Sequence, residues 1–179
     1  MERTLVLVKP DGVQRGLIGT VISRLEDRGL KLAAMKLIQM DANLAGKHYA
    51  EHVDRPFFKG LVDFITSSPV TAMVWEANNV VQLVRQTMGE TDPIKSPPGT
   101  LRGDLGLNIG RNLVHGSDSP ESARREIDLF FEASEILSYE RDIDPWVTES
   151  RQPLRHLTIV FPSRRILVLR DQIYELSHH

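Results

Sequence analysis

Residues 110–118 read G-R-N-L-V-H-G-S-D and place a single histidine, His115, among small and polar neighbours. Gly110 and Gly116 leave little bulk near the ring, whereas a histidine that fills a core is expected among large apolar side chains. An imidazole of ordinary pKa is mostly uncharged at neutral pH, which is the state that a nucleophile needs. The segment predicts an accessible histidine that attacks phosphorus, with a histidine that merely fills the core as the alternative.

A nucleophilic histidine needs a partner for its second ring nitrogen, so that the attacking nitrogen keeps its lone pair. Ser119-Pro120 is a strong helix start, because serine caps helices and proline favours the first helical position. A helix is therefore expected from there to about Phe131, just beyond His115. Glu126 lies on this helix, and we predict that its carboxylate accepts a hydrogen bond from the imidazole.

Phosphoryl transfer depends mainly on positioning and on charge stabilisation, so cations and neutral donors should surround the nucleophile. Candidates come from a strand end, a helix end and a long loop: Lys9, Arg85, Thr91, Arg102 and Asn112. Each of these residues taken alone fits an ordinary surface position. In combination they predict a cluster that grips phosphates.

Hydrophobic periodicity and turn residues predict the elements that must position these side chains. Strands are expected at 4–8, 30–40, 70–75 and 135–137, and helices at 18–25, 44–52, 57–65, 80–88 and 120–131. The segment 90–112 is rich in proline and glycine and lacks periodicity, so it is expected to be a functional loop. This order predicts an α+β fold of the ferredoxin-like type, in which two split βαβ units form a four-stranded antiparallel sheet covered by helices.

The overall composition excludes several classes of function. The chain has 179 residues, which fits one main domain plus an appendage, and its net charge of −2 argues against a general binder of nucleic acid or membranes. It contains no cysteine, begins without a signal-peptide pattern and has no apolar run long enough to span a bilayer. We therefore expect a soluble, cytoplasmic protein.

The end of the chain differs in character from the rest. From Arg151 onward there are five arginines and two acidic residues, although the whole chain is slightly acidic. Two β-prone runs at 157–161 and 166–169 flank a turn at 162–165 and predict a hairpin. Since a lone hairpin is marginally stable in water, it must pack on the domain or on another subunit. We expect a catalytic domain at 1–150 and a C-terminal extension at 151–179.

A set of motifs between Thr4 and about Trp146 resembles the nucleoside diphosphate kinases. The motifs are V-K-P-D-G-V (8–13), R-G-L-I-G (15–19), R-P-F-F (55–58), S-P-V (68–70), A-M-V-W-E (72–76), G-E-T-D-P (89–93), P-G-T-L-R-G-D (98–104) and the segment around His115. The resemblance implies that the γ-phosphate of a nucleoside triphosphate such as ATP or GTP moves to the histidine and then to a second nucleoside diphosphate, a deoxynucleotide included. It also implies Mg²⁺, held by the nucleotide phosphates and not directly by the protein.

The same resemblance implies a role for each matching position. His115 would react through Nδ1, with Glu126 orienting the ring and Ser117 beside it. The remaining roles fall to Arg85, Thr91 and Arg102 on the phosphates, Lys9 and Asn112 on the ribose hydroxyls, Lys9 on the phosphate as well, Tyr49 on the transferred group and Phe57 on the base. Members of the family assemble as tetramers or hexamers built from dimers, and we expect the extension to reinforce such an assembly.

Two other functions compete with this interpretation. The segment His48-Tyr49-Ala50-Glu51-His52 matches the H-x-x-E-H pattern of zinc peptidases, which requires both imidazoles on one helix face, but no third protein ligand is evident. The second is a non-enzymatic binding or regulatory module whose basic extension contacts a partner or nucleic acid. It predicts a damaged site, whereas every position that the family's chemistry uses is intact. No Walker A pattern occurs in the sequence.

Overall fold

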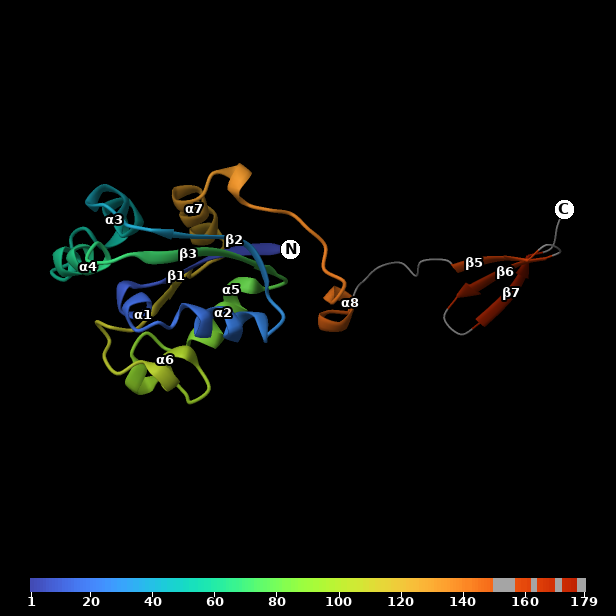
Figure 1. Cartoon of the computed structure of the whole chain (residues 1–179), viewed down its shortest axis with the longest axis horizontal. Coiled ribbons are helices and arrows are strands. Elements are labelled where there is room, and N and C mark those ends of the chain that lie inside the picture. The colour runs from blue at the N-terminus through green and yellow to red at the C-terminus, as the bar shows by residue number, and fades with distance from the viewer. Residues whose placement is uncertain (150–156, 162–163, 170–171, 177–179) are drawn as a thin grey trace. The chain divides into compact units, whose positions relative to one another are not determined.

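The computed structural model describes residues 1–149, 157–161, 164–169 and 172–176 of the chain. It divides into two compact units, Met1–Tyr139 and Glu140–His179. The first unit contains all the predicted site residues and is shown with its elements labelled in Figure 1.

The first unit is built on a four-stranded sheet (Figure 1). Its strands are β1 (Glu2–Val8), β2 (Lys31–Ile38), β3 (Val70–Ala77) and β4 (Val114–Gly116). The spatial order is β2-β3-β1-β4, and every neighbouring pair is antiparallel. This order confirms the predicted ferredoxin-like fold.

The fourth strand, however, is not the one that the sequence predicted. Residues 135–137 were expected to complete the sheet, but Ala133–Glu135 forms a 3-10 turn (η3), and the backbone N–H of Leu137 donates one hydrogen bond of 2.9 Å to Ala33 on β2. The fourth strand is β4, which contains His115. A three-residue strand next to glycine carries no periodicity, so the hydrophobic pattern could not reveal it.

The predicted helices at 18–25, 44–52, 57–65, 80–88 and 120–131 are present with similar bounds, and the structure adds short helices at 10–14, 101–105 and 144–147 that the sequence did not predict. The helices are α1 (Pro10–Gln14), α2 (Ile18–Glu26), α3 (Ala42–His48), α4 (Phe58–Ile65), α5 (Val80–Met88), α6 (Leu101–Leu105), α7 (Pro120–Phe130) and α8 (Asp144–Val147), with 3-10 turns η1 (Ala50–His52) and η2 (Pro93–Lys95). The predicted helix 44–52 is divided into α3 and η1. The segment 90–112 is not structureless, because Thr100 caps α6 by accepting a hydrogen bond from the N–H of Gly103.

The sheet separates two hydrophobic clusters, one on each face. Successive side chains of a strand point to opposite faces, so Leu5 and Leu7 of β1 enter one cluster while Val6 and Val8 enter the other. Figure 1 shows α3, α4 and α7 on the first face and α2, α5 and α6 on the second. All four of these β1 side chains are fully buried, so the strand that leads to Lys9 is anchored on both sides.

The second unit contains α8 and a separate antiparallel sheet in the order β5-β6-β7. Its strands are β5 (Leu157–Phe161), β6 (Arg164–Leu169) and β7 (Gln172–Leu176). The two predicted strands are thus paired as a hairpin, and β7 adds a third strand that was not expected. The expected turn falls partly on residues 162–163, which lie outside the described residues. Among the described residues, no helix combines the length and apolar character that crossing a membrane requires.

Candidate active site

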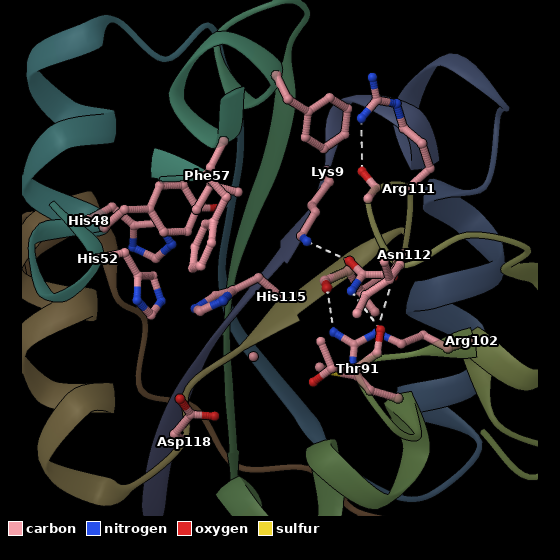
Figure 2. Close-up of a pocket in the computed structure, with 18 of the residues that line it drawn as sticks. Lys9, His48, His52, Phe57, Thr91, Arg102, Arg111, Asn112, His115 and Asp118 are labelled. Atoms are coloured by element: carbon pink, nitrogen blue, oxygen red, sulfur yellow. Dashed lines mark hydrogen bonds between the residues drawn. The ribbon is translucent and has the colours of Figure 1, made fainter. Parts of the chain in front are cut away.

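One cavity of about 730 Å³ gathers nearly all the predicted site residues (Figure 2). The predicted residues that line it are Lys9, Tyr49, Phe57, Arg85, Thr91, Arg102, Asn112, His115 and Glu126. Ser117 is fully buried behind this lining. Segments far apart in the chain therefore converge as the motifs predicted.

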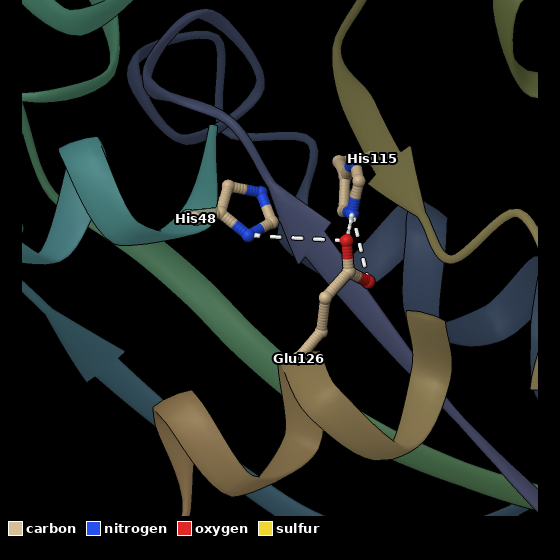
Figure 3. A group of neighbouring side chains, drawn as sticks. All are labelled: His48, His115 and Glu126. Atoms are coloured by element: carbon tan, nitrogen blue, oxygen red, sulfur yellow. Dashed lines mark hydrogen bonds and ion pairs between the residues drawn. The ribbon is translucent and has the colours of Figure 1, made fainter. Parts of the chain in front are cut away.

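His115 stands at the centre of strand β4, on the edge of the sheet. It is paired with Leu7 of β1, and paired residues of an antiparallel ladder point to the same face. The imidazole consequently faces helix α7, where its Nε2 lies 3.1 Å and 3.2 Å from the two carboxylate oxygens of Glu126 (Figure 3). With Nε2 engaged, Nδ1 is the ring nitrogen left for a ligand in the cavity.

Glu126 is held by a second, deeper hydrogen bond. The hydroxyl of Ser117 donates to Glu126 Oε2 at 2.6 Å and accepts the backbone N–H of Leu5 at 3.3 Å. Burial raises the pKa of Glu126, but the hydrogen bond and charge of His115 and the hydrogen bond from Ser117 outweigh burial and leave the pKa below its ordinary value. The carboxylate is therefore an anionic acceptor that fixes the ring of His115.

The glycine after His115 serves packing more than ligand access. A Cβ on Gly116 would lie 2.7 Å from the sulfur of Met88 and 3.1 Å from Val84. Gly110, in contrast, is exposed, and a Cβ there would meet Asn108 alone, at 3.2 Å. The open surroundings expected for the ring thus arise from the cavity, while Gly116 lets β4 pack closely on α5.

Lys9 and Asn112 form a polar pair above His115. The ammonium group of Lys9 donates to Asn112 Oδ1 at 2.5 Å, and Asn112 Nδ2 donates to the carbonyl of Thr91 at 2.9 Å. Burial, followed by the charges of Arg102 and Arg111, lowers the pKa of Lys9 to about 8. An anionic ligand would raise the pKa of Lys9 again, because the negative charge of the ligand favours the protonated form of the lysine.

Arg102 has a backbone role that the sequence did not reveal. Its guanidinium donates to the carbonyls of Gly89 (3.0 Å), Asn112 (3.1 Å) and Val114 (2.8 Å) and is largely buried. Burial and the charge of Arg85 lower the pKa of Arg102 to about 10. Arg102 therefore fixes the residues on the N-terminal side of His115, in addition to presenting positive charge to the cavity.

Arg85 is paired with a residue that the sequence analysis missed. Its guanidinium forms an ion pair with Asp118, and both side chains are substantially exposed at the rim of the cavity. Exposed pairs of this kind contribute little to stability and are easily exchanged for another anion. The only indication in the sequence that Asp118 belongs to the site was its position three residues after His115.

Tyr49 and Phe57 line the same cavity, and the ring of each lies near that of His52. The hydroxyl of Tyr49 is buried without a hydrogen-bond partner among the described residues, and burial raises the pKa of this phenol above its ordinary range. Phe57 is 57% exposed at the cavity mouth. Sequence reasoning missed the apolar residues Phe64 and Ile109 on this lining, and Arg111, whose guanidinium lies 4.0 Å above the Phe64 ring.

A left-handed residue precedes the strand that carries His115. Leu113 has φ of 70°, which is unusual for a residue with a side chain. Its N–H donates to Asp11 Oδ2 at 3.0 Å, and its carbonyl accepts the N–H of Lys9 at 2.8 Å. These two bonds from the start of the chain hold the strained turn, a role for Asp11 that the K-P-D-G motif did not disclose.

The local structure contradicts the zinc-peptidase interpretation. Helix α3 ends at His48, and His52 lies in the separate turn η1, so the two imidazoles do not share one helix face. His48 is buried and packs edge-on against His115, with 4.6 Å between ring centroids. Among the described residues, the group with metal-ligating spacing joins His48 to His115 and Glu126 and does not include His52.

Comparison with known proteins agrees with the geometry of the cavity. A family model described as nucleoside diphosphate kinase matches residues 2–136. The chain is 63% identical over 149 residues to a nucleoside diphosphate kinase of Natronomonas pharaonis, which covers 83% of this chain and 97% of that protein. It is 58% identical over 149 residues to that of Carboxydothermus hydrogenoformans, covering 83% and 100%. The solved nucleoside diphosphate kinase of Halobacterium salinarum in complex with CDP has a TM-score of 0.81 at 54% identity, covering 82% and 98%.

Proposed function

Because the chain belongs to the nucleoside diphosphate kinase family, we propose that His115 carries the phosphoryl group between its two nucleotides. The enzyme transfers the γ-phosphate of a nucleoside triphosphate to a nucleoside diphosphate in two half-reactions that share one site. The observation that supports His115 most directly is its bond to Glu126 through Nε2, which leaves Nδ1 for the cavity.

In the first half-reaction, Nδ1 of His115 attacks the γ-phosphorus. The nitrogen–phosphorus bond forms while the bond from phosphorus to the bridging oxygen of the β-phosphate breaks, and the nucleoside diphosphate leaves. The proton on Nε2 stays in its hydrogen bond with Glu126, and this anionic carboxylate stabilises the positive charge that develops on the ring. The second half-reaction is the reverse, with a different diphosphate as acceptor.

The cations around the cavity stabilise the phosphates. We assign Arg85, Thr91 and Arg102 to the phosphate chain and Tyr49 to the transferred group, which its unpartnered hydroxyl supports. Binding of a phosphate would displace Asp118 from Arg85 and would raise the protonated fraction of Lys9. Both changes require a phosphate group, so they would occur when a nucleotide binds and not when a nucleoside binds alone.

The apolar side of the cavity would receive the base. Phe57 offers an exposed aromatic face, and stacking on a π-face contributes about 1–3 kcal/mol per base with little sequence preference. Lys9 and Asn112 would bind the ribose hydroxyls. CDP is the nucleotide in the Halobacterium salinarum relative, and we extend the range here to purine, pyrimidine and deoxyribose nucleotides such as ATP, GTP and deoxynucleoside diphosphates.

The family's phosphotransfer needs a divalent cation, and we assign Mg²⁺ to that role. Magnesium prefers oxygen ligands and keeps several waters, so it is usually held by substrate phosphates and one or two carboxylates. The carboxylates Glu51 and Asp118 line the same cavity, which fits a cation held mainly by the nucleotide. When bound, the cation neutralises phosphate charge.

Assembly and the extension remain part of the proposal. We infer a cytoplasmic homo-oligomer, a tetramer or hexamer of dimers, in which residues 1–150 catalyse and 151–179 reinforce subunit contacts. Met35 and Leu37 on the edge strand β2 and Ile94 and Leu107 in the long loop are exposed apolar side chains that support such contacts. Truncation after Glu149 would then lower the oligomer size or the melting temperature.

Incubation with γ-labelled ATP and Mg²⁺ tests the proposal. The protein should acquire an acid-labile, base-stable label, and His115→Ala should acquire none. His52→Gln changes another histidine of the cavity lining and should still be labelled. An acid-stable label, or equal labelling of His115→Ala, would overturn the assignment of the nucleophile.

A further inference from the structure

Three side chains with metal-ligating atoms meet at Nε2 of His115 (Figure 3). They are His48, His115 and Glu126, and one ligand atom from each lies within 4.8 Å of the other two. Glu126 Oε1 lies 3.1 Å from His115 Nε2 and 3.9 Å from His48 Nδ1. The half-reactions described above use two of these residues and leave His48 without a role.

These separations are near those of a tetrahedral metal centre. Zinc binds histidine nitrogen and carboxylate oxygen at about 2.0–2.2 Å, which places adjacent ligand atoms about 3.3 Å apart. The pair of His115 and Glu126 already meets this spacing, and His48 would need to move inward by roughly 1 Å or slightly more. All three residues line the cavity, so the fourth position would face it.

His48 has two ring nitrogens that nothing else occupies. Its side chain is fully buried, and neither nitrogen has a hydrogen-bond partner among the described residues. Burial, aided by the charge of His115, lowers the pKa of His48 to about 3, so the imidazole is neutral and offers a lone pair. A buried polar group without a partner is costly, and a metal ion would satisfy it.

The surroundings also resemble those of established metal sites. Ligating carboxylates in proteins are usually oriented by a further hydrogen bond. Ser117 supplies that bond by donating to Glu126 Oε2, which leaves Oε1 for an ion. The single negative charge of Glu126 among neutral imidazoles suits a divalent cation.

We propose that His48, His115 and Glu126 form an inhibitory binding site for a borderline transition-metal ion, with Zn²⁺ as the representative ligand. Two imidazoles and one carboxylate suit zinc or cobalt, whereas Mg²⁺ prefers an octahedron of oxygens. The site therefore differs in its ligand chemistry from the nucleotide-bound cation. Its occupation rests on the geometry of the three side chains, and its inhibitory effect rests on the proposed role of His115 Nδ1.

Inhibition follows from the position of one proton. A neutral imidazole carries a single N–H, and in the active state this proton is on Nε2 in the bond to Glu126. A metal ion binds through the lone pair of an Nε2 that carries no proton. In a neutral imidazole the single ring proton must then be on Nδ1, so metal binding moves this proton within the ring and releases none to solvent. Nδ1–H has no lone pair with which to attack phosphorus. Conversely, a phosphoryl group on Nδ1 leaves the ring as an imidazolium, and a metal can bind Nε2 only after the proton that Glu126 holds there is released to solvent. Phosphorylation and metal binding therefore oppose each other.

Cobalt(II) absorption tests the site on the full-length protein, because tetrahedral Co²⁺ has intense visible bands that the hexaaqua ion lacks. The wild type should develop these bands on titration with Co²⁺, and Zn²⁺ should remove them by displacement. His48→Phe should weaken Co²⁺ binding by at least about tenfold. His52→Gln is the matched control and should keep the bands. All three proteins retain His178 and His179, so binding by that pair is common to them.

A second arm uses the phosphoenzyme formed from ATP and Mg²⁺ and then freed of nucleotide. It should bind Co²⁺ more weakly than the unphosphorylated protein, and Zn²⁺ added before ATP should block labelling of the wild type more than that of His48→Phe. Should His48→Phe fold poorly by circular dichroism, His48→Gln takes its place. Equal bands in the wild type and the His48 variant, or equal Co²⁺ binding by the phosphoenzyme, would refute the proposal. Absence of labelling in Mg²⁺ alone would instead refute the function assigned to His115.

Discussion

Leu7 and His115 face each other across the β1–β4 ladder, and Leu7 is fully buried beneath the imidazole. Leu7 anchors β1 in the core, and its pairing with His115 sets the face of the sheet from which the imidazole projects. The ring's tilt is set by a different pair, Ser117 and Glu126. The position of the imidazole therefore depends both on core packing and on one buried chain of hydrogen bonds. Substitutions can test these two contributions separately.

Ser117→Ala should cost both stability and rate. The change removes the donor to Glu126 Oε2 and leaves the buried N–H of Leu5 without its partner, a loss of about 1–3 kcal/mol. We expect a lower urea midpoint with an unchanged m-value, together with slower phosphoenzyme formation. A variant with wild-type stability would show that these hydrogen bonds contribute nothing to the free energy of unfolding.

Glu126→Gln should slow phosphoryl transfer by roughly 100-fold or more, because an amide cannot stabilise the charge that develops on the ring. The pKa of Glu126 is lowered in the folded state, so its contribution to stability is present above its unfolded pKa and is lost as pH falls through the folded pKa. Unfolding measured between pH 7 and pH 3 should therefore be less pH-dependent in Glu126→Gln than in the wild type. Parallel curves would contradict this.

Lys9 should set the alkaline limit of the reaction. Its pKa of about 8 means that the free enzyme loses this positive charge above that pH, so kcat/KM should decline there. Since the lowered pKa disfavours the charged form in the folded state, stability should rise with pH between about 8 and the unfolded value of 10.5. Lys9→Arg should remove the alkaline decline in a pH profile of kcat/KM, whatever its effect on the maximum, and a decline that persists would assign the limit to another group.

Gly116→Ala should destabilise the protein by about 1–3 kcal/mol, since the new Cβ would lie 2.7 Å from the sulfur of Met88 in the core. Gly19→Ala is the matched control, because nothing lies within 4 Å of a Cβ there and the position is helical. It should leave stability unchanged or raise it by up to about 1 kcal/mol. Thermal unfolding of both variants measures the difference, and equal melting temperatures would show that Met88 relaxes freely.

The sequence predicted most of the framework because its signals are local. Periodicity located β1, α2, β3 and α5 nearly to the residue, and the predicted capping residue Ser119 accepts a hydrogen bond from the N–H of Ser122. Nine of the ten site residues that the motif resemblance implied line one cavity. What the resemblance could not supply were interactions that arise between distant segments: the strand character of 114–116, the three carbonyls on Arg102, the Asp118 partner of Arg85, and the support that Asp11 gives to Leu113.

The bond between Asp11 and Leu113 joins positions 102 residues apart. Contacts of such long sequence separation close late during folding, because the entropy of the intervening loop must be lost first. The left-handed turn before His115 gains its hydrogen bond to Asp11 only when the start of the chain has met the segment that leads into β4, the last strand of the four-stranded sheet. Recovery of phosphotransfer after dilution from denaturant thus reports completed topology, and helix signals will return earlier than enzyme turnover.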